Sequence, residues 1–204
     1  MPQKAATPPV KWMTALPAKS VKEFVALARS HPGQINYSSS GNGSAPHLSM
    51  ALFASMAGIR LVHVPYKGGA PQVTALVSGE TQASLATLST VLAHIQSGRL
   101  RALGVASLKR SNALPELPTI AEAGVPGYEM SPWVGAFAPA GTAATLVNLI
   151  NRETARTLNL PDVKERLLNA GVEVVANSPA EFAAMMKADV AKWSKVIRQV
   201  GIQE

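Results

Sequence analysis

The chain has 204 residues, of which 47% are hydrophobic and 15% charged, so it can bury a core and is not disordered. It contains no cysteine, which excludes a disulfide framework and cysteine-based metal or redox sites. The formal net charge of +7 comes from scattered lysines and arginines, a pattern that does not favour a nucleic-acid partner.

Neither a membrane span nor an export signal is expected. Residues 1–19 are predicted to form an irregular N-terminal tail, because Met1 to Leu16 holds three prolines and two lysines and has no apolar core segment. The longest uncharged run, Met130 to Asn151, is interrupted by prolines and a glycine, which is typical of a strand, a turn and a helix start.

Helices are predicted where an N-terminal cap precedes apolar residues at helical spacing. Ser20 and Glu23 form a capping box, which predicts a first helix that ends near His31. Ser178, Pro179 and Glu181 combine a cap, a first-turn proline and a box at the start of the last helix. Further helices are expected over residues 44–57, 71–77, 89–96, 142–158 and 162–170 (with Asp162 as cap), and a short one after Pro118, capped by Thr119 and Glu122.

Strands are predicted between these helices, over residues 35–39, 61–66, 83–88, 100–106, 133–138 and 172–176. Strands that alternate with helices and are apolar on both faces predict an α/β fold with an open, mostly parallel sheet covered by helices on both faces. In such sheets ligands bind at the carboxyl ends of the strands.

A glycine-rich stretch links the first predicted strand to a helix and is the leading candidate site. Its residues are Ser39, Ser40, Gly41, Asn42, Gly43 and Ser44. The glycines let the backbone approach a ligand, and the first amides of the helix that follows suit a carboxylate or phosphate. The alternative is an ordinary turn between a strand and a helix with a serine cap.

Two further segments are predicted to lie at the same edge of the sheet. Tyr66, Lys67 and Gly68 follow the second strand, and Thr87 lies at the end of the third. Lys67 could reach an anion, although most such lysines are simply solvated. Trp133, in a later strand, could form a wall of the site or belong to the core.

The sequence gives little support to an enzyme. The run Gly41-Asn42-Gly43-Ser44 is not a Gly-x-Ser-x-Gly elbow, and no phosphate-loop or dinucleotide fingerprint is complete. The four histidines are far apart in sequence, and His47 is interpreted as a packing or loop-orienting residue. Polar groups without reactive partners favour binding over catalysis, so no catalytic residue, metal or cofactor is expected.

Several motifs together resemble the Bug family, the substrate-binding receptors of tripartite tricarboxylate transporters. The resemblance begins with Tyr37-Ser38-Ser39-Ser40-Gly41-Asn42-Gly43-Ser44-x-x-His47 and extends from about Ser20 to the C-terminus. It continues through His63-Val64-Pro65-Tyr66-Lys67-Gly68, Gly98-Arg99-Leu100-Arg101-Ala102-Leu103, Leu117-Pro118-Thr119-Ile120-Ala121-Glu122-Ala123-Gly124 and Trp133-x-Gly135-x-Phe137-Ala138-Pro139-Ala140-Gly141-Thr142.

This resemblance implies a periplasmic binding protein of type II architecture, with two lobes that close on a small carboxylate. It also implies that Ser39, Gly41, Gly43 and Ser44 form one wall of the carboxylate site. Family members begin with an export signal and a first-lobe loop that supplies the opposite wall, and we expect neither in this sequence. We therefore expect an incomplete first lobe, a ligand-binding lobe over residues 20–130, and a C-terminal strand-helix segment over residues 131–204.

The expected partners follow from the same resemblance. They are a small organic acid (a di- or tricarboxylate, or a carboxylate-bearing amino acid or aromatic acid) and the membrane components of the transporter. Homo-oligomers are expected through an uncovered C-terminal segment, whose apolar residues are Val147, Leu149, Ile150, Phe182, Met186 and Trp193. The alternative function is the effector-sensing domain of a transcription regulator, which can share this architecture.

Overall fold

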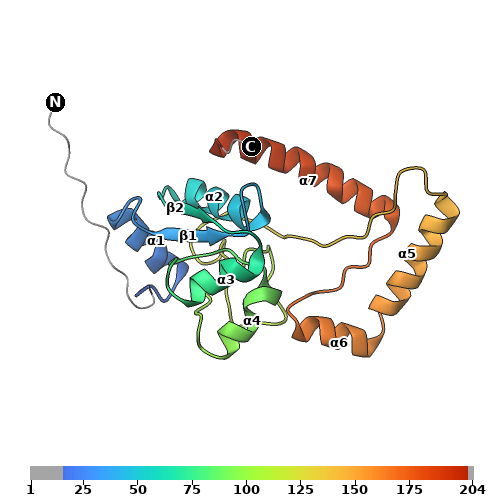
Figure 1. The fold of residues 1–204 in the computed structure, drawn as a ribbon, viewed down its shortest axis with the longest axis horizontal. Coiled ribbons are helices and arrows are strands. Elements are labelled where there is room, and N and C mark those ends of the chain that lie inside the picture. Colours follow the sequence, from blue (N-terminus) through green and yellow to red (C-terminus); the bar gives the residue numbers. More distant parts are fainter. Residues whose placement is uncertain (1–15, 202–204) are drawn as a thin grey trace.

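A computed structural model describes residues 16–201 of the chain, so most of the predicted tail lies outside the described residues. Seven helices and two strands are described within them (Figure 1). In chain order they are α1 (Val21–Ser30), β1 (Asn36–Ser39), α2 (Ala45–Ala57), β2 (Val62–Pro65), α3 (Gly69–Val77), α4 (Leu88–Gln96), α5 (Ala144–Leu158), α6 (Pro161–Asn169) and α7 (Pro179–Val200).

The sheet is parallel and short. β1 and β2 pair from Asn36 opposite Val62 to Ser39 opposite Pro65. A single parallel bridge from Tyr37 to Ala83 adds the next extended segment on the other side of β1. The three carboxyl ends therefore lie at one edge of the sheet, as the sequence predicts.

Four predicted strands do not form ladders. Residues 83–87 and 100–106 make only single bridges, at Ala83 with Tyr37 and at Val105 with Thr119, and Leu88 already belongs to α4. Residues 133–138 and 172–176 run without regular secondary structure between helices. A strand needs a neighbour for its amides and carbonyls, and within residues 16–201 these segments have no paired partner along their length.

Two helix predictions also need correction. Thr119 and Glu122 do form their reciprocal capping bonds, but the chain makes only a turn there before Gly124, whose φ is +121°. α6 begins at Pro161, so Asp162 lies in its first turn instead of capping it. The cap of α1 by Ser20 and the capping box of α7 at Ser178 are confirmed.

Residues 16–130, here called the core lobe, carry helices on both faces of the sheet. α1 and α2 pack on one face, where Phe24 meets Phe53 with ring centroids 6.0 Å apart, and α3 and α4 lie on the other (Figure 1). Tyr128 is fully buried, packs edge-on against Phe53 and donates its hydroxyl proton to the Ser49 carbonyl at 3.1 Å. Through these contacts of Tyr128, the segment after Thr119 packs against α2.

Residues 131–201, here called the arm, leave the core lobe as an extended segment and carry α5, α6 and α7. Met130 is the last buried residue among the side chains that the structure describes. α7 then returns to the core lobe, where it lies beside α2 (Figure 1). Lys192 pairs there with Glu129 at 2.5 Å, and Trp193, which is half-buried, packs against the core. That Trp193 lacks part of its cover stays a prediction.

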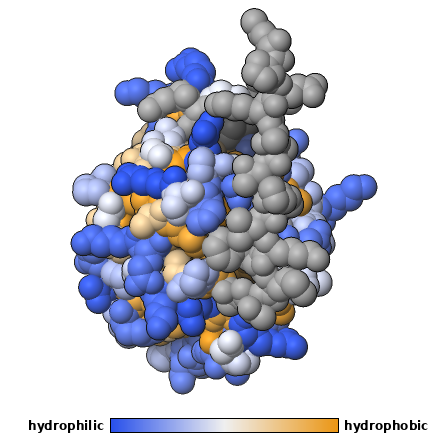
Figure 2. All heavy atoms as spheres, turned by 90° about the vertical axis from the view of Figure 1, so that its left-hand side faces the viewer, coloured by the Kyte–Doolittle hydropathy of each residue, from blue (hydrophilic) through white to orange (hydrophobic). Residues whose placement is uncertain are grey.

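Figure 2 looks onto the end of the core lobe that lies opposite the arm. Seen from that end, its surface is mostly hydrophilic, with smaller apolar areas between the polar side chains (Figure 2).

No helix within residues 16–201 has both the length and the apolar character that crossing a bilayer requires.

Candidate functional site

Residues 39–44, here called the anion loop, connect the end of β1 to the start of α2. Gly41 and Gly43 have φ values of +135° and +70°, which other residues rarely adopt. A Cβ at Gly41 would stand 3.6 Å from the Tyr66 carbonyl oxygen, so the loop lies against the segment after β2. Asn42 and Gly43 are exposed at its tip. The predicted sharp turn is therefore present.

Ser44 does not cap α2 with its side chain. Its hydroxyl donates to the Gly41 carbonyl at 2.7 Å, and its amide donates to the same oxygen at 3.3 Å. The first-turn amides of α2 thus receive no acceptor from the cap residue. The cap residues of α3 and α4, Gly68 and Thr87, give no side-chain acceptor either, although the Thr87 carbonyl accepts the amide proton of Thr90 at 2.9 Å. Three helices therefore begin at this sheet edge with their positive dipole ends available to an anion.

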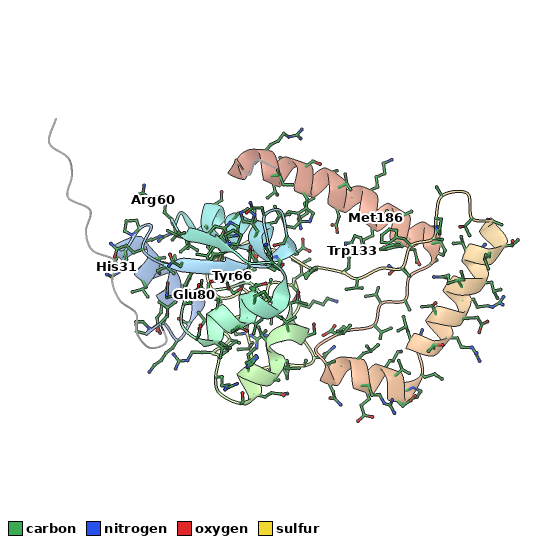
Figure 3. The ribbon with its side chains drawn as sticks, viewed as in Figure 1. His31, Arg60, Tyr66, Glu80, Trp133 and Met186 are labelled. Atoms are coloured by element: carbon green, nitrogen blue, oxygen red, sulfur yellow. The ribbon has the colours of Figure 1, made fainter. Side chains whose placement is uncertain are left out.

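The segment Tyr66–Gly68 is hydrogen-bonded to the anion loop. The amide of Tyr66 donates to the Ser39 carbonyl at 2.9 Å, and that of Gly68 donates to the Ser40 carbonyl at 3.2 Å. Lys67 is exposed between them. The Tyr66 hydroxyl turns to Glu80 at 2.7 Å (Figure 3), and burial together with this carboxylate raises the pKa of Tyr66 to about 12. Tyr66 is therefore held as a neutral phenol.

Three aromatic rings lie beneath the anion loop. His47 of α2 stacks on His63 of β2 with ring centroids 3.9 Å apart and planes within 6° of each other, and Tyr37 of β1 stacks on His63 at 4.9 Å. The amide of Gly43 donates to His47 Nδ1 at 3.1 Å, and His63 Nε2 lies 2.6 Å from Ser39 Oγ. Ser39 is fully buried, so its hydroxyl shapes the loop from below.

Burial shifts the pKa values of these rings. It lowers the pKa of His47, and it lowers the pKa of His63 to about 4 with a further contribution from the charge of His47. It also raises the pKa of Tyr37 to about 12. At neutral pH all three rings are therefore uncharged.

Trp133 belongs to an aromatic cluster that joins the first segment of the arm, before α5, to α7. Its ring meets Phe182 edge-on at 5.0 Å, and its indole N–H donates to Asp189 at 2.6 Å. Phe137 packs against both rings. Figure 3 shows Trp133 near Met186 of α7, where the first arm segment passes that helix. Trp133 is thus fixed in place, with 39% of its surface exposed.

A cleft of about 1600 Å³ lies between the core lobe and the arm. Thr87 and Trp133 line it, as do Ala45 and Pro46 at the start of α2. The anion loop and Tyr66–Gly68 lie outside this lining, although they adjoin it through Ala45. The structure therefore divides the predicted site residues into a hydrogen-bonded group around the anion loop and a pair, Thr87 and Trp133, on the cleft.

Sequence reasoning missed several partners of these residues. His63 contacts Ser39, Glu80 contacts Tyr66, and Asp189 contacts Trp133. Tyr37 stacks on His63. His63 is paired with Tyr37 by strand register, and Asp189 reaches Trp133 across 56 residues. No local motif signals such contacts. For His47, the interpretation as a loop-orienting residue agrees with its bond to Gly43.

Known proteins resemble almost the whole chain. The family described as "Tripartite tricarboxylate transporter family receptor" matches residues 7–202. A protein encoded in the tcbD-tcbE intergenic region of Pseudomonas sp. strain P51 is 38% identical over 180 residues, which are 88% of this chain and 54% of that protein. The chain thus spans about half the length of this curated relative.

Solved structures agree in both fold and extent. R. palustris Rpa4515, solved with adipate, is 36% identical and superposes with a TM-score of 0.88 over 93% of this chain and 64% of its own. The periplasmic binding protein BugD is 30% identical with a TM-score of 0.81, over 92% and 64%. MatC from Rhodopseudomonas palustris, solved with malate, is 29% identical with a TM-score of 0.81, over 89% and 63%. At 29–36% sequence identity, these three likenesses bear on function as well as on the fold.

Proposed function

We propose that this chain, which belongs to the tripartite tricarboxylate transporter family of receptors, forms one wall of a solute-binding site for a small organic carboxylate. The observation that carries the proposal is the anion loop, where Ser44 leaves the first-turn amides of α2 without a side-chain cap. Family members are periplasmic binding receptors, so we assign the chain no catalysed reaction. The family match favours transport over the sensing domain of a regulator.

The carboxylate would bind to the exposed part of the anion loop. Asn42 would offer its amide and polar side chain beside the first-turn amides of α2. Gly43 and Ser44, whose amides donate to His47 and to the Gly41 carbonyl, would hold this shape, and Ser40 and Gly41 would shape the approach. Ser39 would act from beneath through its buried hydroxyl. Tyr66, Lys67 and Gly68 would extend the same wall, and the ammonium of Lys67 would add to the attraction for the carboxylate on the anion loop.

A small dicarboxylate is the ligand class we favour. The neighbours solved with adipate and malate each hold a dicarboxylate. One carboxylate would rest on the anion loop and the other would extend toward the cleft, past Thr87 and Trp133. The apolar surface of Trp133 suits the hydrocarbon part of such a ligand.

The isolated chain should bind weakly. The anion loop is open to water, where each hydrogen bond to an anion contributes on the order of 1 kcal/mol. A few such bonds, less the cost of immobilising the ligand, give a millimolar Kd, or about −4 kcal/mol. A second wall would exclude water and strengthen each contact.

Two glycine variants test the site. Gly43→Val and Gly33→Val place the same side chain at nearly the same φ, +70° and +73°, and neither Cβ would meet an atom within 4 Å. Both should therefore lose similar stability, but only Gly43 lies in the anion loop. Calorimetric titration with adipate and malate should show binding to the unchanged chain and to Gly33→Val, and none to Gly43→Val. Equal binding by a folded Gly43→Val protein would overturn the proposal.

We further propose that the arm mediates association, with a second copy or with the membrane part of a transporter in the periplasm. Leu146, Leu149 and Ile150 of α5 are each 44–49% exposed, and this apolar surface favours contact. Light scattering should show that the unchanged chain forms oligomers. The double variant Leu149→Ser with Ile150→Ser should be a monomer. Arg156→Ser on the same helix is the control, since its exposed pair with Glu153 contributes little. A monodisperse monomer at high concentration would contradict self-association.

A further inference from the structure

The stacked histidines beneath the anion loop hold it from two sides. His47 accepts the Gly43 amide proton through Nδ1, and His63 approaches Ser39 Oγ through Nε2. Ser39 Oγ also accepts the Gly41 amide proton at 3.2 Å. Gly43 is therefore bonded directly to His47, whereas Gly41 is linked to His63 through the hydroxyl of Ser39.

The geometry fixes the protonation of His47. The Gly43 amide can only donate, so Nδ1 must carry a lone pair and the ring proton must lie on Nε2. A proton added to His47 would go to Nδ1, where it would face the Gly43 N–H. The bond would then be lost, and the exposed tip of the loop would lose its anchor to α2.

We propose that His47 and His63 are positioning residues that keep the anion loop in its binding shape as neutral imidazoles, and that protonation of His47 releases Gly43. The inference deepens the proposed function, because it concerns the same loop, but the hydrogen bonds on which it rests involve no ligand.

Charge and burial both oppose protonation of the pair. Two imidazolium rings at 3.9 Å would repel each other, and His47 is buried and His63 half-buried. Tyr37 is the ionisable group that stacks on the pair from β1, and it is uncharged. α7 also packs against α2, and its charged residues beyond the first turn are Lys187, Asp189, Lys192, Lys195 and Arg198. Asp189 and Lys192 are engaged with Trp133 and Glu129.

The sign of the pH dependence follows from the lowered pKa values. An unfolded histidine titrates near pH 6.5. Because the folded pKa values of His47 and His63 lie below this, the pair stabilises the folded chain fully above about pH 6.5. This stability declines as the pH falls below that point, down through the folded pKa of His63 at about 4. Acid should therefore loosen the anion loop before it unfolds the core lobe.

NMR on the ligand-free chain tests the inference. Imidazole ¹⁵N shifts should show His47 as the Nε2–H tautomer, and the Gly43 amide resonance should move with the protonation of His47 as the pH is lowered. In His47→Asn, whose side-chain oxygen can accept as Nδ1 does, Gly43 should stay bonded and its titration should vanish. In His47→Phe, which keeps a ring but has no acceptor, Gly43 exchange should quicken at least tenfold.

His94→Asn on α4 is the matched control and should leave the titration of Gly43 unchanged. An Nδ1–H tautomer of His47 in the unchanged chain, or a Gly43 titration that persists in His47→Asn, would overturn the inference. So would slow Gly43 exchange in a folded His47→Phe protein. If these bonds are found but no carboxylate binds, the proposed function fails and the positioning role stands.

Discussion

The core lobe and the arm differ in where their apolar side chains lie. In the core lobe, Ile35 and Tyr128 are fully buried. In the arm, Val134 is 100% exposed and Phe137 68% exposed. Both regions contain capped helices and glycines that fit their neighbours closely, so local order is similar in the two. The core lobe is therefore the unit that holds the fold together, whereas the arm is ordered mainly by its own helices, of which α7 packs against α2 of the core lobe.

The likeness to full-length receptors sharpens this contrast. The chain superposes on Rpa4515 with a TM-score of 0.88 over 93% of its length, so the arm has the same course as in that longer protein. About a third of Rpa4515 has no counterpart here, because the match covers 64% of that chain. We propose that the exposed apolar side chains of the arm are those that such an additional lobe would cover.

Aromatic truncations should separate the two regions most strongly. Tyr128→Ala removes a fully buried ring and its hydrogen bond to Ser49, and should cost about 3–5 kcal/mol. Phe137→Ala removes a ring that is largely exposed and should cost less than about 1 kcal/mol. Urea unfolding followed by circular dichroism measures both. Comparable losses would mean that the arm belongs to the same cooperative unit.

Crowded glycines give a second comparison. A Cβ at Gly104 would stand 3.1 Å from the Pro118 carbonyl oxygen and 3.3 Å from Val21, so Gly104→Ala should destabilise the core lobe by about 1–3 kcal/mol. A Cβ at Gly135 would overlap the Phe182 ring. Gly135→Ala should displace the indole N–H resonance of Trp133 yet leave the unfolding midpoint of the core lobe nearly unchanged. A global loss of stability in Gly135→Ala would break the distinction.

Helix caps give the smallest effect. Ser20 and Ser178 both accept the amide proton of a glutamate three residues on, at 3.2 and 3.3 Å. Each substitution by alanine should weaken its helix by about 1 kcal/mol. Hydrogen exchange should report the loss throughout the core lobe for Ser20→Ala, but mainly in α7 for Ser178→Ala. The same exchange pattern for both variants would show that the two regions unfold together.

Local signals in the sequence predict the helices well because a helix makes its own hydrogen bonds. The capping box at Ser178 and the cap at Ser20 define their helices without any distant partner. A strand depends on its neighbour, and residues 133–138 and 172–176 show that apolar, β-prone residues do not form a ladder where no strand lies beside them. The predicted domain boundary near residue 130 stays a prediction.

The same distinction applies to the candidate site. The turn at Gly41 and Gly43 could be predicted, because it depends on glycines adjacent in sequence. The contacts of His63 with Ser39 and His47 could not, since they join β1, β2 and α2 in space. That the predicted site residues bind a ligand stays a prediction.

The most direct test of the central claim, that the core lobe supplies one wall of a carboxylate site, is an amide-resolved NMR titration of the chain with adipate. We expect shifts that centre on Asn42, Gly43, Ser44 and the first turn of α2, and that saturate in the millimolar range. Shifts confined to another surface, or none at these amides, would contradict the claim. Micromolar binding by a monomer would show that the site is complete without a second wall.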